Sequence, residues 1–247
     1  MKPSRRYLTL FTLTLPLFSC SCEGIKPPPS RPLEPPPEEV SIKPGINDDF
    51  LKSDVDLAKW KSTFENAEAR EIAQQKEAIV ASMKLKKGQD VADVGSGTGL
   101  FLKPLADSVG VAGKVYALDI SAPFVDGLKK RVKLEGLEQV EVRLSKERSV
   151  ELPALSIDAA FVCDTYHHFE YPQHVLYSLY KAVRPLGSLY VVDFERIPGQ
   201  SRQWVLDHVR CDKKTTIKEI EQAGFHFEEQ ISMPSLKENY ILRFSRP

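Results

Sequence analysis

Residues Val91–Gly99 read V-A-D-V-G-S-G-T-G, and this stretch decides the fold. A short apolar run ends at an acid and gives way to three glycines at alternate positions, and the residues that follow, 100–108, are compatible with a helix. Glycine lets the backbone turn sharply and lets a ligand approach it closely, because no Cβ stands in the way. The N-terminus of the following helix offers unpaired N–H groups to a polar or anionic ligand. The sequence therefore predicts a strand, a ligand-binding loop and a helix.

The spacing of these glycines separates two kinds of nucleotide-binding loop. A dinucleotide fingerprint requires G-x-G-x-x-G after a strand. Gly95 and Gly97 satisfy it, but the third position is Leu100 and the last glycine, Gly99, comes one residue early. With Asp93 just before it, the loop resembles motif I of the class I S-adenosylmethionine-dependent methyltransferases.

A second apolar run, within residues 115–120, reaches an acid, Asp119, about twenty residues further on. In Rossmann-like folds an acid at the tip of the second strand accepts hydrogen bonds from the ribose hydroxyls, which is the role expected of Asp119. An alternative is that Asp119 only caps the helix that begins near Ser121. The resemblance places Ile120 against the adenine ring and Ser145, which follows a third strand at residues 140–144, beside the adenine amine.

Later segments continue the resemblance. Leu152-Pro153 and residues 157–164 resemble the family's run into the fourth strand, and residues 182–193 resemble its turn into the fifth, with Leu186 in place of one glycine. Asp164 is expected to face the methionine end of the cofactor. The cofactor-binding residues that the resemblance implies are Asp93, Gly95, Ser96, Gly97, Gly99, Asp119, Ile120, Ser145, Asp164 and Arg70.

Apolar strands alternate with helical segments, which indicates a parallel α/β sheet. We expect helices at residues 64–83, 123–135, 172–183 and 215–223. Two final strands, at residues 225–232 and 240–244, are joined by a connection too short for a parallel crossover, so they should form an antiparallel hairpin. The expected fold is α/β: a Rossmann-like seven-stranded, mostly parallel sheet with helices on both faces and an antiparallel C-terminal hairpin.

The acceptor pocket of the family follows the fourth strand, where this chain has Tyr166, His167 and His168. These are the candidate catalytic residues, and a histidine there could act as general base. The alternative is that one imidazole caps a turn and the other is solvated, since adjacent side chains usually point apart. A metal site that adds His174 is disfavoured, because no two of these histidines have i, i+4 spacing and no cysteine pair joins them, so no metal is predicted.

Two further segments are candidates for covering the site. Residues 60–70 include Trp60, Phe64, Glu65 and Arg70, where related enzymes have a lid, and Arg70 is a candidate partner for the cofactor carboxylate or a plain surface charge. Residues 204–210, with Trp204, His208 and Arg210, lie where a substrate-facing insertion is common in the family.

The two ends of the 247-residue chain differ in character. Residues 1–22 combine a basic start, a short apolar stretch and Cys20, and resemble a bacterial lipoprotein signal. Residues 23–47 contain two proline triplets and are expected to form an extended linker, followed by the methyltransferase domain at residues 48–247. We therefore expect export or membrane anchoring through Cys20, with a cytoplasmic location as the alternative.

Three functions are compatible with this reading. The first is an S-adenosylmethionine-dependent methyltransferase that acts on a small-molecule acceptor; a net charge of zero disfavours nucleic acid as a partner. The second is a catalytically silent binding or scaffold protein of the cell envelope, because an exported enzyme has no obvious supply of this cofactor. The third, a nicotinamide-dependent oxidoreductase, is disfavoured by Leu100 and the C-terminal hairpin.

Overall fold

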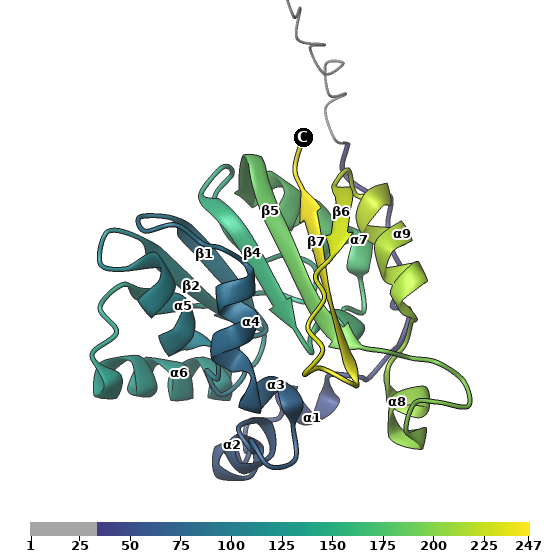
Figure 1. Ribbon diagram of the computed structural model, residues 1–247, viewed down its shortest axis with the longest axis horizontal. Coiled ribbons are helices and arrows are strands. Elements are labelled where there is room, and N and C mark those ends of the chain that lie inside the picture. The colour runs from purple at the N-terminus through teal and green to yellow at the C-terminus, as the bar shows by residue number, and fades with distance from the viewer. Residues whose placement is uncertain (1–33) are drawn as a thin grey trace, which may run out of the picture. The chain divides into compact units, whose positions relative to one another are not determined.

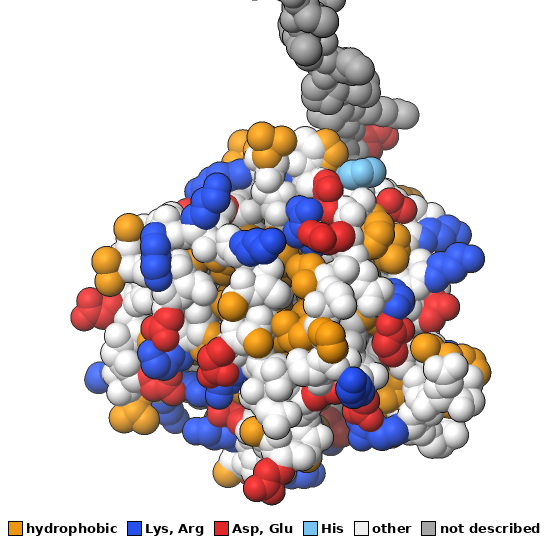
Figure 2. Space-filling model, in the orientation of Figure 1, with side chains coloured by type: hydrophobic (Ala, Val, Ile, Leu, Met, Phe, Trp, Pro, Cys, Tyr) orange, Lys and Arg blue, Asp and Glu red, His pale blue; other side chains and the backbone are white. Residues whose placement is uncertain are grey.

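The structure, a computed structural model, describes residues 34–247. The predicted signal segment, Cys20 and the first proline triplet of the predicted linker lie outside the described residues. Between residues 34 and 247, every helix is too short or too polar to cross a bilayer. Lysine and arginine side chains are interspersed with acidic ones over the face shown in Figure 2.

A seven-stranded sheet with the order β3-β2-β1-β4-β5-β7-β6 forms the centre of the fold (Figure 1). The strands from β1 to β5 pair in parallel, and β7 runs antiparallel to both β5 and β6, which confirms the predicted fold class. The sequence order of the strands reverses between β1 and β4, so their carboxyl ends form the crevice in which open α/β sheets bind ligands. The strands are β1 (Asp90–Val94), β2 (Lys114–Asp119), β3 (Val140–Leu144), β4 (Ile157–Cys163), β5 (Val183–Phe194), β6 (His226–Gln230) and β7 (Asn239–Ser245).

Helices cover both faces of this sheet. Apolar side chains of α3, α4, α5 and α6 form one core with one face of the sheet, and those of α7 and α9 form a second core with the other. Figure 1 shows α1, α2 and α8 at the lower edge of the sheet, where β4 and β5 end. The helices are α1 (Asp48–Leu51), α2 (Leu57–Phe64), α3 (Glu71–Gln74), α4 (Lys76–Ser82), α5 (Leu102–Val109), α6 (Ala122–Glu135), the 3-10 turn η1 (Tyr166–His168), α7 (Pro172–Ala182), α8 (Gln203–His208) and α9 (Lys213–Gln222).

The single helix expected at residues 64–83 is wrong. The chain leaves α2 at Phe64, makes a turn around Asn66 and re-enters a helix only at α3. The Asn66 side-chain oxygen accepts hydrogen bonds from the N–H groups of Glu68 and Ala69, at 3.0 and 3.2 Å. An asparagine side chain that binds nearby backbone in this way competes with the helical hydrogen bonds. The break turns Phe64 and Arg70 toward the end of the sheet.

Part of the predicted linker packs against the fold, and we call residues 38–47 the N-terminal strap. The Glu39 carboxylate accepts hydrogen bonds from the N–H groups of Gln173 and His174 at the start of α7, which is a favourable place for an anion. Nearer to β4, Asn47 is buried and its amide donates to the carbonyl of His168 at 3.0 Å. The strap therefore contacts the segment that follows β4.

Gly99 is expected to be indispensable for packing. Its φ is +92°, and a Cβ there would lie 2.9 Å from Leu102 and 3.0 Å from Leu128, both buried. Gly99→Ala should lower the free energy of unfolding by roughly 2–4 kcal/mol, because left-handed strain adds to overpacking. Gly136→Ala is the matched control: its φ is +63°, nothing lies within 4 Å of the added Cβ, and about 1 kcal/mol is expected. Denaturant unfolding measures both, and equal losses in the two variants would contradict the packing role.

Candidate functional site

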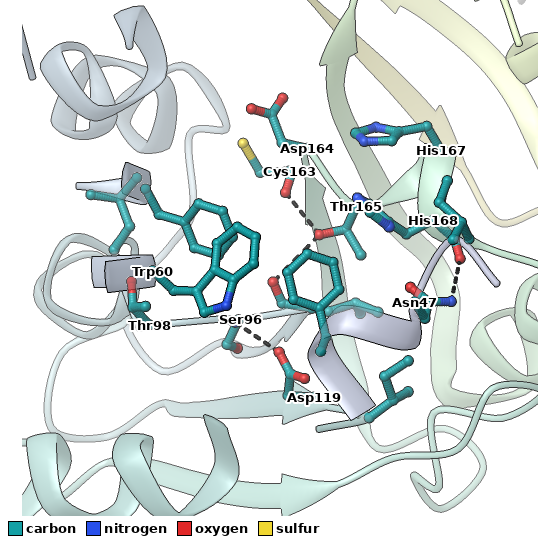
Figure 3. Close-up of a pocket in the computed structure, with 18 of the residues that line it drawn as sticks. Asn47, Trp60, Ser96, Thr98, Asp119, Cys163, Asp164, Thr165, His167 and His168 are labelled. Carbon is teal, nitrogen blue, oxygen red and sulfur yellow. Dashed lines mark hydrogen bonds between the residues drawn. The ribbon is translucent and has the colours of Figure 1, made fainter. Parts of the chain in front are cut away.

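A cavity of about 890 Å³ opens at the carboxyl ends of β1, β2 and β4. Small-molecule sites in proteins usually measure about 300–1,000 Å³, so this one is large enough for a cofactor together with a second small molecule. Figure 3 shows Asp119 and Ser96 on the lower side of the cavity, His167 and His168 on its right and Cys163 and Asp164 at its top, with Thr165 between these groups. The cavity therefore joins the predicted cofactor loop to the predicted acceptor residues.

The glycine loop follows β1 and forms one wall. The N–H groups of Gly95 and Ser96 donate to the carbonyl of Leu118 in β2, at 2.8 and 2.9 Å, which ties the loop to the neighbouring strand. Gly95 has a φ of +74°, and a Cβ there would lie 2.3 Å from the Thr165 side chain. Gly97 has a φ of +53°, and a Cβ there would lie 3.6 Å from the ring of Phe64. Both line the cavity, whereas Gly99, which was predicted to do so, faces the helices instead.

Asp119 is buried at the tip of β2. Its Oδ2 accepts a hydrogen bond from the Gly97 N–H and its Oδ1 one from the Ser121 N–H, both at 2.8 Å. Burial raises the pKa of this carboxyl to about 6, against the lowering effect of those N–H groups. The side-chain cap of α6 comes from the Ser121 hydroxyl, which accepts from the N–H of Phe124, so capping is not the role of Asp119. Ile120 and Ser145 line the cavity beside Asp119.

Asp93 is also buried, one residue before the end of β1. The Ser96 hydroxyl donates to the backbone carbonyl of Asp93 at 2.9 Å, while the carboxylate Oδ2 has no hydrogen-bond partner within residues 34–247. Burial raises the pKa of Asp93 to about 7, and the negative charge of Asp119 acts in the same direction. An unsatisfied carboxylate oxygen on a cavity wall is suited to a cationic or N–H donor group of a ligand.

Arg70 and Asp164 form an ion pair across the cavity wall. Arg70 Nη2 lies 2.5 Å from Asp164 Oδ2, and the amide of Asn239 donates to Asp164 Oδ1 at 2.7 Å. Burial raises the pKa of Asp164 to about 6, and the Arg70 guanidinium opposes that rise. Both residues line the cavity as predicted, but they bind each other, so the expected pairing of Arg70 with a cofactor carboxylate stays a prediction.

Aromatic side chains from α1 and α2 cover the cavity. The ring centroids of Phe50 and Trp60 lie 4.9 Å apart, and those of Trp60 and Phe64 lie 5.0 Å apart. Phe50 also makes an edge contact with His168, with centroids 5.4 Å apart. Trp60 and Phe64 were predicted to form a lid, and Phe50 extends it from the glycine loop to the histidines.

Three histidines meet at the other end of the cavity: His167 and His168 in η1, and His208 at the end of α8. Their ring centroids are 4.4 to 5.2 Å apart, and all three line the cavity. The prediction that His167 and His168 point apart is wrong, because the tight 3-10 turn directs both rings to the same side. His174, named with them in the sequence, instead contacts Glu39 at 3.0 Å.

The surroundings of these imidazoles fix their orientation and charge. Asp193, at the end of β5, accepts a hydrogen bond from the backbone N–H of His167 at 3.0 Å and lies 2.7 Å from its Nδ1. Burial lowers the pKa of His168 well below its ordinary value and that of His208 to about 4, and the charges of His167 and Lys43 act in the same direction. Both shifts favour the neutral imidazole over the imidazolium.

Tyr166 does not belong to this group, which corrects its prediction as a catalytic residue. It is fully buried and is not among the residues that line the cavity. Its hydroxyl donates to Glu219 of α9 at 2.7 Å, and Arg210 also pairs with Glu219, at 2.9 Å. Both side chains therefore fix the helices behind the cavity and do not face it.

Several residues in the cavity wall or directly behind it were not identified from the sequence. Phe50 and Thr165 line the cavity, whereas Asn239 and Asp193 stand behind it and hold Asp164 and His167. The position of Asp193 at the carboxyl end of β5, next to β4, is the one clue that could have identified it, since such ends converge.

Comparison with known proteins finds methyltransferases. Residues 92–191, which include the glycine loop, Asp119 and the two histidines of η1, match the family model described as a methyltransferase domain. The chain is 27% identical over 122 residues to the ubiquinone/menaquinone biosynthesis C-methyltransferase of Neisseria gonorrhoeae (strain NCCP11945), covering 49% of each chain. It is 31% identical over 126 residues to the nocamycin O-methyltransferase of Saccharothrix syringae, covering 51% of this chain and 44% of that one.

A solved structure extends the similarity beyond the matched residues. The structure of an S-adenosylmethionine-dependent methyltransferase from Aquifex aeolicus superposes with a TM-score of 0.67 at 26% identity, covering 77% of this chain and 98% of that one. Over residues 92–191 the chain is therefore similar to methyltransferase domains, and most of its fold is similar to that of an S-adenosylmethionine-dependent methyltransferase. The chain spans about half the length of the curated relatives it matches.

The residues of this chain fit the cofactor that the domain implies. Gly95 and Gly97 line the cavity without a Cβ, which at Gly95 would collide with Thr165, and the unpartnered oxygen of Asp93 is an acceptor for an amino group. Asp119 retains carboxylate lone pairs beyond the two already used by N–H groups, so ribose hydroxyls can still donate to it.

Asp93 is expected to destabilise the ligand-free protein as pH rises. Its pKa in the folded chain, about 7, exceeds the ordinary value of 3.8, so the folded state binds the proton more tightly and ionisation opposes folding. Asp93→Asn, which cannot ionise, should gain stability over the parent protein as pH rises from 4 to 7, reaching on the order of 2–4 kcal/mol. Unfolding curves at several pH values measure this difference, and a difference that does not change with pH would contradict it.

Proposed function

We propose that the protein transfers a methyl group from S-adenosylmethionine to a small-molecule acceptor bound beside His167, His168 and His208. The observation that supports this most strongly is the shared cavity: the glycine loop and Asp119 lie at one end, and the histidines lie at the other. The matched relatives include one named as a C-methyltransferase and one as an O-methyltransferase, so their names leave the acceptor atom open.

Each wall of the cavity has a distinct task in this proposal. Asp119 and the backbone of Gly95 and Gly97 would hold the nucleoside part of S-adenosylmethionine, whose sulfonium supplies an already activated methyl group. Orientation of two bound molecules alone can contribute several kcal/mol toward the barrier of such a transfer. Phe50, Trp60 and Phe64 would exclude water from the cavity, and the imidazoles would bind the acceptor's polar group.

Calorimetric titration of the full chain separates this proposal from its alternatives. S-adenosylmethionine and S-adenosylhomocysteine should bind at micromolar concentrations and NADH should not. Asp119→Asn should weaken binding of both by at least about tenfold, since loss of a charge-assisted hydrogen bond costs ~1.5–3 kcal/mol. Asp126→Asn, on the exposed surface of α6, is the matched control and should bind like the parent protein.

The outcomes point in different directions. Binding of NADH alone would indicate an oxidoreductase, and no binding of any of the three compounds would favour the silent scaffold protein. Equal weakening by Asp119→Asn and Asp126→Asn would contradict the placement of the ribose.

Export and lipid attachment at Cys20 are a separate proposal, supported by the basic start, the apolar stretch and the cysteine that follows it. Mass spectrometry of the membrane fraction should find a chain that begins at a lipid-modified Cys20. Recovery of an unprocessed, unmodified chain would contradict it.

A further inference from the structure

The three histidines that end the cavity are arranged in a way that general acid–base chemistry does not require. Each offers one imidazole nitrogen, and these nitrogens all lie within 4.8 Å of one another. The Nε2 atoms of His168 and His208 are 3.4 Å apart. A single hydrogen bond can satisfy one such pair, but among three converging nitrogens at least one pair consists of two lone pairs or two N–H groups that face each other. When all three nitrogens present lone pairs, a cation between them removes the repulsion.

One nitrogen–nitrogen distance in this cluster already matches that of a metal centre. Nitrogens bound to Zn²⁺ at about 2.0–2.1 Å in tetrahedral geometry are about 3.4 Å apart, which is the separation of His168 and His208. The widest nitrogen pair, at up to 4.8 Å, would have to shorten by roughly 1 Å or more. His208 lies at the end of the six-residue helix α8 and its ring stacks on Trp204 with centroids 4.8 Å apart, so a change of its side-chain torsion would also have to move this contact.

His167 is paired with a carboxylate through the ring nitrogen that would not bind the metal, which is common for metal-binding histidines. Asp193 Oδ1 lies 2.7 Å from His167 Nδ1, and its Oδ2 accepts the backbone N–H of the same residue. Both side chains are buried, so Nε2 is the nitrogen left to face the cavity. A carboxylate that holds Nδ1–H in this way fixes the ring orientation and makes Nε2 a better ligand. The buried carboxylate also supplies negative charge next to the site.

One cation lies nearby and must be considered. Lys43, in the N-terminal strap, donates to the backbone carbonyls of Asp207 and His208 at the end of α8. Its ammonium hydrogens are therefore directed at carbonyl oxygens and hold the helix that bears His208 in place. This contact orients one of the three imidazoles, although the lysine charge itself opposes a second cation.

We propose that His167, His168 and His208 bind one divalent transition-metal ion of the zinc type and leave one coordination position open to the cavity. Imidazole ligands suit zinc, copper, iron and nickel, and three protein ligands with one open position are the arrangement of catalytic rather than structural zinc. If the proposed function holds, on which this last step rests, the open position binds an oxygen or sulfur of the methyl acceptor. The acceptor class is then an alcohol, phenol, enol or thiol.

The test is metal binding by the full chain, prepared without a polyhistidine tag and stripped with a chelator. Titration with Co²⁺, followed by visible absorption and by competition with Zn²⁺, should show one tight equivalent. His208→Ala should weaken binding by at least about 100-fold and Asp193→Asn by about 10–100-fold, as expected for loss of a ligand and of its supporting partner. His226→Ala, which removes an exposed histidine of β6, is the matched control and should bind like the parent protein.

Circular dichroism shows whether each variant is folded, and His208→Gln repeats the test with a polar side chain of similar length. Binding of less than one equivalent, or binding that His208→Ala and His208→Gln weaken no more than His226→Ala does, would overturn the inference. Calorimetry with S-adenosylmethionine distinguishes failure of the metal-site proposal from failure of the proposed function. Cofactor binding without metal binding overturns the metal site alone, and metal binding without cofactor binding supports the metal site and overturns the proposed function.

Discussion

The hydrogen bonds between the buried Asp119 carboxylate and two backbone N–H groups hold the site together. One N–H belongs to Gly97 in the loop after β1, and the other belongs to Ser121 at the start of α6. A carboxylate taken out of water is costly unless such donors compensate it. The contact therefore fixes the loop against the second strand and, in the same geometry, leaves acceptor lone pairs on the cavity wall.

The cavity is rich in negative charge that the protein does not fully neutralise. Burial raises the pKa of Asp93 to about 7 and that of Asp119 and Asp164 to about 6. Of the three, only Asp164 has an ion-pair partner in the described residues, namely Arg70. A ligand that brings a sulfonium and an ammonium group would relieve this imbalance. Ionisation of these buried carboxyl groups lowers the stability of the ligand-free protein, and the same negative charges favour binding of a cationic cofactor. Binding sites commonly reduce stability in this way.

Sequence patterns predicted the sheet and its final hairpin, and they named Asp93, Gly95, Gly97 and Asp119, which the structure brings to one cavity, because glycine spacing and strand-end acids are local signals. They did not predict the break at Asn66, where a side chain competes with a helix that composition favours. They also missed the histidine cluster. His208 lies forty residues beyond His168, and only the folding of α8 onto η1 brings the two rings together. Tyr166 was misplaced for a related reason, since a 3-10 turn sends neighbouring side chains in directions that sequence order does not reveal.

A crystal structure of the full chain with S-adenosylhomocysteine tests the account most directly. The account predicts ribose hydroxyls within hydrogen-bonding distance of Asp119, the amino group near Asp93, and the sulfur facing the side of the cavity formed by His167, His168 and His208. A ligand bound elsewhere, or a cavity in which the rings of Phe50, Trp60 and Phe64 occupy the nucleoside position, would contradict it.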